Sequence, residues 1–150
     1  MKFQNDEPKI HIIYEQMADL MKKFLLPFMK GERVEAVRAH KLSTLDLARH
    51  TQLSDGDFVI GEPTRQALKK LTEEQQRAQL LGIPAFFTAL AAFLQTRLPF
   101  EDKLLRFLSC LNPDQRSDAS LRVIEFVATK LRMPAADIAN VSDEWRFVHS

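Results

Sequence analysis

The 150-residue sequence has little of what most secreted scaffolds and nucleotide-binding sites require. It contains one cysteine, Cys110, so no disulfide can form within the chain and nothing points to a disulfide-stabilised, secreted fold. Its four glycines argue against a glycine-rich phosphate loop and against an all-β fold with many tight turns. The 21 basic and 20 acidic residues nearly cancel, so no global field attracts nucleic acid or an anionic membrane.

Motifs for catalysis and metal binding are also missing. The sequence contains no G-x-S-x-G, P-loop or G-x-G-x-x-G pattern. Its histidines lack the H-x-x-x-H or H-E-x-x-H spacing of a metal site: His11, His40, His50 and His149. Its acidic pairs lie at expected helix starts, where the helix dipole explains them: Asp6-Glu7, Glu73-Glu74, Glu101-Asp102 and Asp143-Glu144. We therefore predict no catalytic residues, no metal site, no cofactor and no enzyme activity of the chain's own.

Targeting and membrane signals are weak. Residues 1–9 lack the apolar core of a signal peptide. The most apolar window, residues 82–94, is shorter than the roughly 20 residues of a membrane span. Cys110 lies in an apolar run, where a cysteine is typically a small buried hydrophobe. We expect a nuclear or cytoplasmic protein that is not secreted and has no membrane partner.

Apolar residues at steps of three and four, the spacing of a helix that faces a core, dominate the rest of the sequence. The clearest stripe contains Ile10, Ile13, Tyr14, Met17, Leu20, Met21, Phe24, Leu25 and Phe28. Pro27 should end or kink this helix. Side-chain caps are expected at Asn5 or Asp6, at Ser117 or Asp118, and in a capping box formed by Thr72 and Gln75. Further helices are expected over residues 32–42, 63–71, 73–98, 101–111, 118–131 and 137–148.

Two stretches allow alternatives. Gly82 and Pro84 either kink one long helix or separate two, with Ala78, Leu81, Phe87, Leu90, Leu94 and Leu98 facing inward. Leu45 and Leu47 belong either to a short helix or to an extended segment, and residues 58–60 are β-prone but too few for a sheet. The economical fold is all-α: an irregular bundle of about six to eight helices that forms one domain over residues 1–150.

Basic residues are concentrated between residues 20 and 42, which contain six lysines and arginines and only two glutamates. A solvated helix face is one interpretation, and weak, salt-sensitive contact with DNA phosphates is the other. The candidate DNA contacts are Lys22, Lys23, Lys30, Arg33, Arg38 and Trp145. The ring of Trp145 could stack on a base, although a core position explains it more simply.

The aromatic residues suggest a second class of function. Phe86 and Phe87 are adjacent, so they cannot both face the same side of a helix. One of them must pack on a second neighbour or remain exposed as part of a partner surface. With eleven phenylalanines and balanced charge, the chain could be a helical protein–protein interaction module with no nucleic-acid role.

Four segments, in this order, resemble hAT-type (hobo/Activator-like) transposase-derived proteins. They are residues 2–11 (KFQNDEPKIH), residues 24–30 (FLLPFMK), Lys103-Leu104-Leu105 running on to Cys110-Leu111-Asn112-Pro113, and Asp143-Glu144-Trp145-Arg146. The resemblance covers nearly the whole chain. It implies that the chain is part of the helical insertion of such a protein, with some flanking core sequence.

The resemblance also implies a role. In that family an RNase H-like core with three metal-binding acids performs cut-and-paste DNA transposition, and many relatives are domesticated. No position here matches those acids, and the family's N-terminal zinc finger and C-terminal dimerisation segment have no counterpart. The resemblance therefore implies a non-catalytic scaffold, with DNA as a weak electrostatic partner. The other implied partners are a second copy and the RNase H-like core of the same protein.

Overall fold

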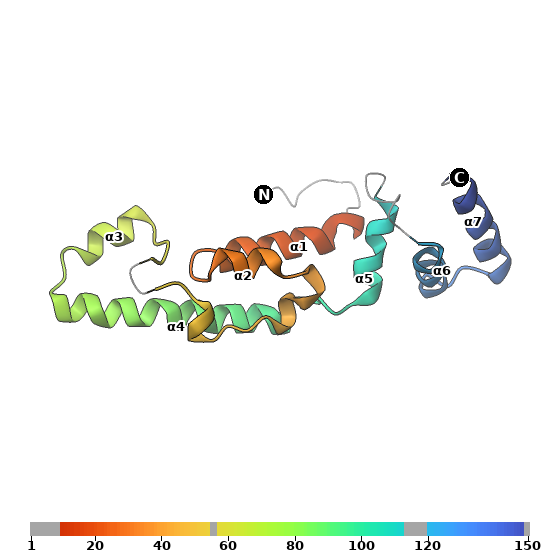
Figure 1. The fold of residues 1–150 in the computed structure, drawn as a ribbon. Coiled ribbons are helices and arrows are strands. Elements are labelled where there is room, and N and C mark those ends of the chain that lie inside the picture. Colours follow the sequence, from red (N-terminus) through yellow and green to blue (C-terminus); the bar gives the residue numbers. More distant parts are fainter. Residues whose placement is uncertain (1–9, 55–56, 113–119, 149–150) are drawn as a thin grey trace. The chain divides into compact units, whose positions relative to one another are not determined.

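A computed structural model describes residues 10–54, 57–112 and 120–148, with no side-chain description from residue 146 onward. These residues form seven α-helices and three short 3-10 helices, so the predicted all-α fold is confirmed (Figure 1). The α-helices are α1 (Ile10–Leu25), α2 (Gly31–Ala36), α3 (Glu62–Leu68), α4 (Glu73–Arg97), α5 (Lys103–Phe107), α6 (Leu121–Lys130) and α7 (Ala135–Val148). The 3-10 helices are η1 (Ala39–Thr44), η2 (Arg49–Thr51) and η3 (Leu108–Leu111).

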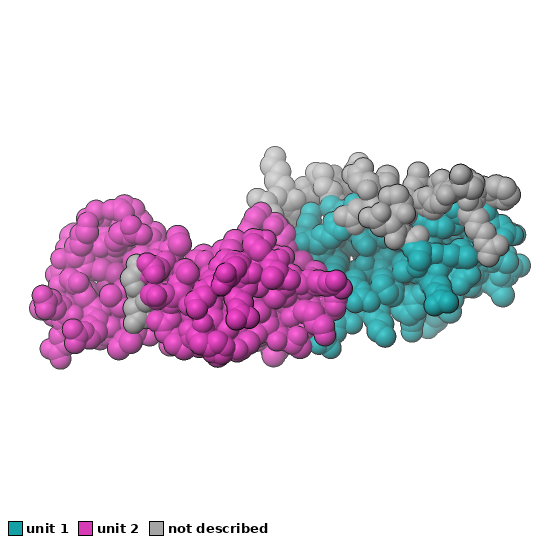
Figure 2. Space-filling model, viewed as in Figure 1, with its two compact units in different colours: residues 1–16, 101–150 teal, residues 17–100 magenta. Residues whose placement is uncertain are grey.

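The contacts within the chain group into two compact units (Figure 2). Residues 17–100 form one, here called the central unit, and residues 1–16 with 101–150 form the other, called the terminal unit. Each has a hydrophobic cluster of its own. The expectation of a single domain over residues 1–150 stays a prediction, since it concerns whether the two units fold together.

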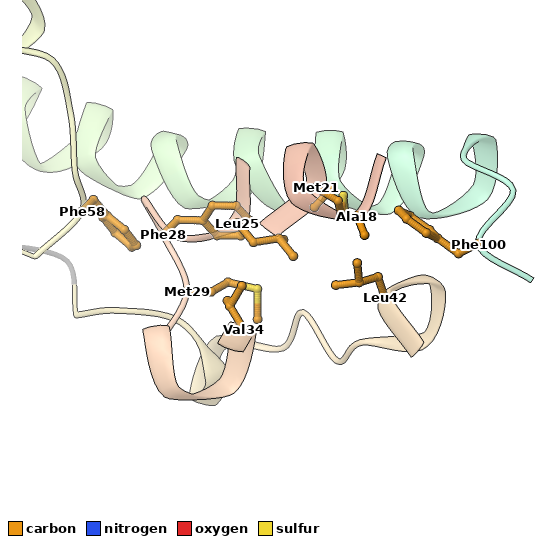
Figure 3. Packing of buried hydrophobic residues seen from close by; sticks show 10 residues of the cluster. Ala18, Met21, Leu25, Phe28, Met29, Val34, Leu42, Phe58 and Phe100 are labelled. Carbon is orange, nitrogen blue, oxygen red and sulfur yellow. The ribbon is translucent and has the colours of Figure 1, made fainter. Parts of the chain in front are cut away.

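The core of the central unit forms where α1 ends. Met21 and Leu25 of α1 converge with Val34 of α2 and Leu42 of η1, all fully buried (Figure 3). The helix ends at Leu25, two residues before Pro27, as the missing proline N–H predicts. The exposed fractions of Ile10, Ile13 and Leu20 (54%, 39% and 45%) show that part of the predicted stripe does not face a core.

Three aromatic rings join α1 to α4 in this core. Phe28 stacks on Phe87 with 5.2 Å between ring centroids, and Phe24 meets the edge of Phe28 at 5.9 Å. Offset and edge-to-face contacts of this kind add roughly 1 kcal/mol beyond the area they bury. Phe87 is therefore the member of the Phe86–Phe87 pair that packs inward.

The segment between α1 and α3 is mostly irregular and is held by backbone hydrogen bonds. Leu53 N–H donates to the carbonyl of Phe28 at 2.9 Å, and Val59 N–H donates to that of Pro27 at 2.9 Å. Leu45 and Leu47 lie outside any helix, which resolves that alternative in favour of an extended segment. The predicted helix over residues 32–42 divides into α2 and η1, because the backbone is extended between them.

Helix α4 runs without a break through Gly82 and Pro84, so the single-helix alternative is correct. The predicted capping box starts it: Gln75 N–H donates to Thr72 Oγ1 at 3.4 Å, and Thr72 N–H donates to Gln75 Oε1 at 3.1 Å. Pro84 has no N–H, so the carbonyl four residues earlier loses its helical donor. Capping at the start and packing along one side outweigh that local loss.

The prediction of which residues of α4 face inward is partly wrong. Ala78 and Leu81 are exposed, Leu81 by 61%, and the four later residues of the expected set are only half-buried. The buried positions of α4 are Pro84 and Ala91. Because apolar residues surround α4 on every side, their spacing could not identify the side that faces the core.

The terminal unit packs α5, η3, α6 and α7 around a smaller cluster. Its buried members are Leu108, Cys110, Ile124 and Val127. The predicted helix over residues 101–111 is α-helical only in α5, which Asp102 caps by accepting from Leu105 N–H at 3.1 Å. Leu111 and Leu131 are exposed, by 51% and 55%. The predicted caps at Asn5 or Asp6 and at Ser117 or Asp118 lie outside the described residues.

Helix α6 ends in a left-handed turn. Arg132 has φ 60°, its N–H donates to Thr129, and the N–H of Met133 donates to Ala128 at 3.1 Å. This is the paired hydrogen-bond pattern that usually places glycine at the left-handed position. Pro134 follows, and α7 begins at the next residue.

Candidate interaction surfaces

The five basic residues expected to contact DNA all belong to the central unit. They lie at the end of α1 (Lys22 and Lys23), before α2 (Lys30), in α2 (Arg33) and before η1 (Arg38). The structure thus places them on consecutive elements of one unit.

Contacts within the protein already engage the three lysines. Lys22 Nζ donates to the carbonyl of Glu35 at 3.4 Å, and Lys30 Nζ donates to that of His50 at 2.9 Å. Lys23 Nζ lies 2.7 Å from a carboxylate oxygen of Asp19 on the same helix. Arg33 and Arg38 have exposed side chains and are therefore the members best placed to meet a phosphate.

Trp145 belongs to a different unit from these five residues. It lies on α7 in the terminal unit, half-buried against the cluster that contains Ile124 and Val127. This burial fits the core interpretation of the indole better than base stacking.

Burial changes the pKa of two groups of the terminal unit. Burial raises the pKa of the Cys110 thiol, which keeps it protonated and weakly nucleophilic at neutral pH. Burial also raises the pKa of Tyr14, partly offset by the positive charge of Arg106. Within residues 10–54, 57–112 and 120–148, no three histidine, cysteine or acidic side chains gather as a metal site would require.

The most unusual surface of the described chain is the side of α4 that faces away from the core. We call it the outer face of α4 and define it by Leu81, Ala85, Phe86, Ala89, Ala92 and Phe93. Leu81, Phe86 and Phe93 are exposed by 61%, 64% and 53%. Of the two alternatives for the Phe86–Phe87 pair, packing on a second neighbour or exposure, the structure shows exposure, with Phe86 on the surface.

Side-chain hydrogen bonds join α4 to residues 42–52 and fix the direction of the outer face. Gln95 Nε2 donates to the carbonyls of Leu42 and Leu45, both at 2.9 Å. Gln52 Nε2 donates to Thr88 Oγ1 at 2.9 Å. These bonds prevent α4 from rotating its exposed residues into the core of the central unit.

A shallow groove of about 500 Å³ runs beside the outer face. Leu81, Ala85 and Ala89 line it on α4, and Arg49 and Gln52 line its other wall. Arg49 donates to the carbonyl of Leu53 and lies 5.5 Å from the ring centroid of Phe58. Gln52 Oε1 is buried without a hydrogen-bond partner among the described residues. The groove widens the apolar surface beyond α4 itself.

By length and composition alone, α4 is long and apolar enough to cross a membrane. Only 11% of its most apolar window is buried inside the structure. The window of residues 82–94 considered in the sequence was therefore too narrow, because uncharged residues continue on both sides of it. The feature to be explained is a long helix with an apolar side that the described residues leave uncovered.

Comparisons of the chain with protein-family models, curated proteins and solved structures give no match. The resemblance to hAT-type proteins therefore rests on the four quoted segments alone. The surfaces described above carry the functional argument.

Proposed function

We propose that this chain is a non-catalytic helical protein-interaction module whose contact surface is the outer face of α4. One observation carries the proposal: Leu81, Phe86 and Phe93 stand exposed on a helix whose other side already packs in a core. Contiguous exposed apolar side chains are typical of sites that bind another protein. Covering them would remove apolar surface from water, which is worth roughly 25 cal/mol per Å².

The contacts of α4 favour a protein partner over a lipid bilayer. Gln95 joins α4 to the carbonyl of Leu42 in η1 and to that of Leu45, in a segment of short 3-10 helices and extended backbone. If α4 crossed a membrane in this arrangement, the backbone of that segment would enter lipid, where unsatisfied polar groups cost several kcal/mol each. A protein surface can cover the outer face without moving the segment.

The second candidate is a scaffold of a hAT transposase-like protein with weak DNA contact. The exposed side chains of Arg33 and Arg38 favour it, since both could reach phosphates without breaking an internal contact described above. Such contacts carry no sequence information and weaken as salt rises. This candidate and the first use different surfaces of the central unit, so each can be tested separately.

The first proposal is tested by placing a photoreactive amino acid at Ala85 of the full protein, in cells that express it. We expect light to join Ala85 to a polypeptide, and the Leu81→Lys background to reduce the adduct several-fold. The same photoreactive residue at Glu32, exposed on α2, is the matched control. An adduct with lipid alone, or none above the Glu32 level, would contradict the proposal.

A further inference from the structure

We propose that the partner of the outer face of α4 is a second copy of this chain, with the two α4 helices antiparallel about a two-fold axis at Ala85. This inference rests on the proposed function, because it assigns an occupant to the same face. It is argued from the charges and side-chain sizes along α4.

The charges of α4 are complementary to those of an antiparallel copy. Glu73 and Glu74 lie in its first turn, followed by Arg77, so residues 73–77 have a net charge of −1. Arg97 gives the last turn a charge of +1, and residues 78–96 carry no charge. Antiparallel pairing places the acidic end of each helix beside the basic end of the other, and it opposes the two helix dipoles. Parallel pairing would bring like charges together at both ends. The charge pattern therefore selects the antiparallel arrangement.

Side-chain sizes along the outer face match the same symmetry. Ala85 is the middle residue of α4, so its small side chain would lie at the crossing point and let the backbones approach closely. In the antiparallel pair, a residue that precedes Ala85 by a given number of positions lies opposite the residue that follows Ala85 by the same number. Leu81 of one copy therefore lies opposite Ala89 of the other. Each large aliphatic side chain thus meets a small one, as close packing requires.

The next positions outward continue this match. Ala78 lies opposite Ala92, so small side chains meet there as well and let the two helices stay close. A two-fold dimer uses the same patch on both copies, and α4 supplies both halves of every pair named here.

Disulfide trapping tests the arrangement in the 150-residue chain. In a Cys110→Ala background, Ala85→Cys, Ala78→Cys and Ala92→Cys are made separately and oxidised mildly. We expect Ala85→Cys to form a dimer alone, because the two copies of this position meet at the axis within disulfide distance. Ala78→Cys and Ala92→Cys should each stay largely unlinked, but an equimolar mixture of the two should form a mixed dimer.

The opposite pattern would overturn the inference. Ala78→Cys and Ala92→Cys each linking to themselves would show parallel pairing. An absence of linkage in all variants, with helix content unchanged by circular dichroism, would show that no copy covers the face. If the Ala85→Cys variant fails to fold, the mixture of the Ala78→Cys and Ala92→Cys variants still shows whether the pairing is antiparallel. A photo-crosslink from Ala85 to a different polypeptide would remove the second copy as partner and leave the proposed function standing, whereas a lipid adduct alone would remove both.

Discussion

At the scale of single residues, the left-handed backbone of Arg132 at the end of α6 should affect the stability of the protein. Its φ of 60° costs a side chain free energy that glycine does not incur. We expect Arg132→Gly to raise the free energy of unfolding by up to about 1 kcal/mol, measured by chemical denaturation.

The matched control is Arg122→Gly on α6, an exposed arginine in a right-handed helical position. It should lower the free energy of unfolding by about 1 kcal/mol, because glycine is a poor helix former there. Equal effects of the two substitutions would show that Arg132 does not adopt the left-handed conformation.

Burial of the Cys110 thiol predicts how stability depends on pH. Its pKa is raised on folding, so the folded state favours the protonated thiol. The associated stability is fully present below the unfolded pKa of about 8.5 and is lost as pH rises above that value. The free energy of unfolding should therefore fall above pH 8.5, and less steeply in Cys110→Ala. Identical slopes from pH 7 to 10 would contradict this account.

At the scale of elements, the two sides of α4 should respond differently to truncation. Phe28 is fully buried against this helix, so Phe28→Ala should lower the free energy of unfolding by about 3–5 kcal/mol. Phe86→Ala removes an exposed ring of equal size. It should change the free energy of unfolding by no more than about 0.5 kcal/mol in dilute solution. A large loss from Phe86→Ala under those conditions would show that the outer face belongs to a core.

Local signals predicted the helix boundaries well where a single residue determines the backbone. Pro27 acts through its missing N–H and the capping box at Thr72 through its side chains, so the effects of both can be predicted from a few neighbours. The side of α4 that faces the core could not be predicted. Apolar residues surround that helix, and only the packing of Phe87 and Ala91 in the folded chain distinguishes its two sides.

At the scale of the whole molecule, the sequence indicated two candidate functions and the structure gives each a different surface. The basic residues and Trp145 were grouped by chemistry, but they lie in separate units. The outer face of α4 was foreseen only through Phe86, because exposure depends on the tertiary fold.

The DNA candidate predicts weak, salt-dependent binding. Duplex DNA should bind at about 10⁻⁵ M in low salt, and affinity should fall steeply as salt rises, measured by fluorescence anisotropy. Replacing Arg33 and Arg38 together by alanine should reduce the salt slope by about 2. The control, Arg65→Ala on α3 with Lys69→Ala directly after α3, removes the same exposed charge and should leave the slope unchanged. Binding that ignores salt, or none at low salt, would eliminate the candidate.

The central claim is that the outer face of α4 mediates association. The most direct measurement is the mass of the chain in solution by light scattering, from micromolar concentrations upward, for the wild type and for the double variant Leu81→Lys, Phe93→Lys. Both positions are exposed, so helix content and thermal stability should be unchanged in the dilute variant. We predict a wild type that approaches dimer mass and a double variant that remains monomeric. Equal masses at every concentration would contradict the claim.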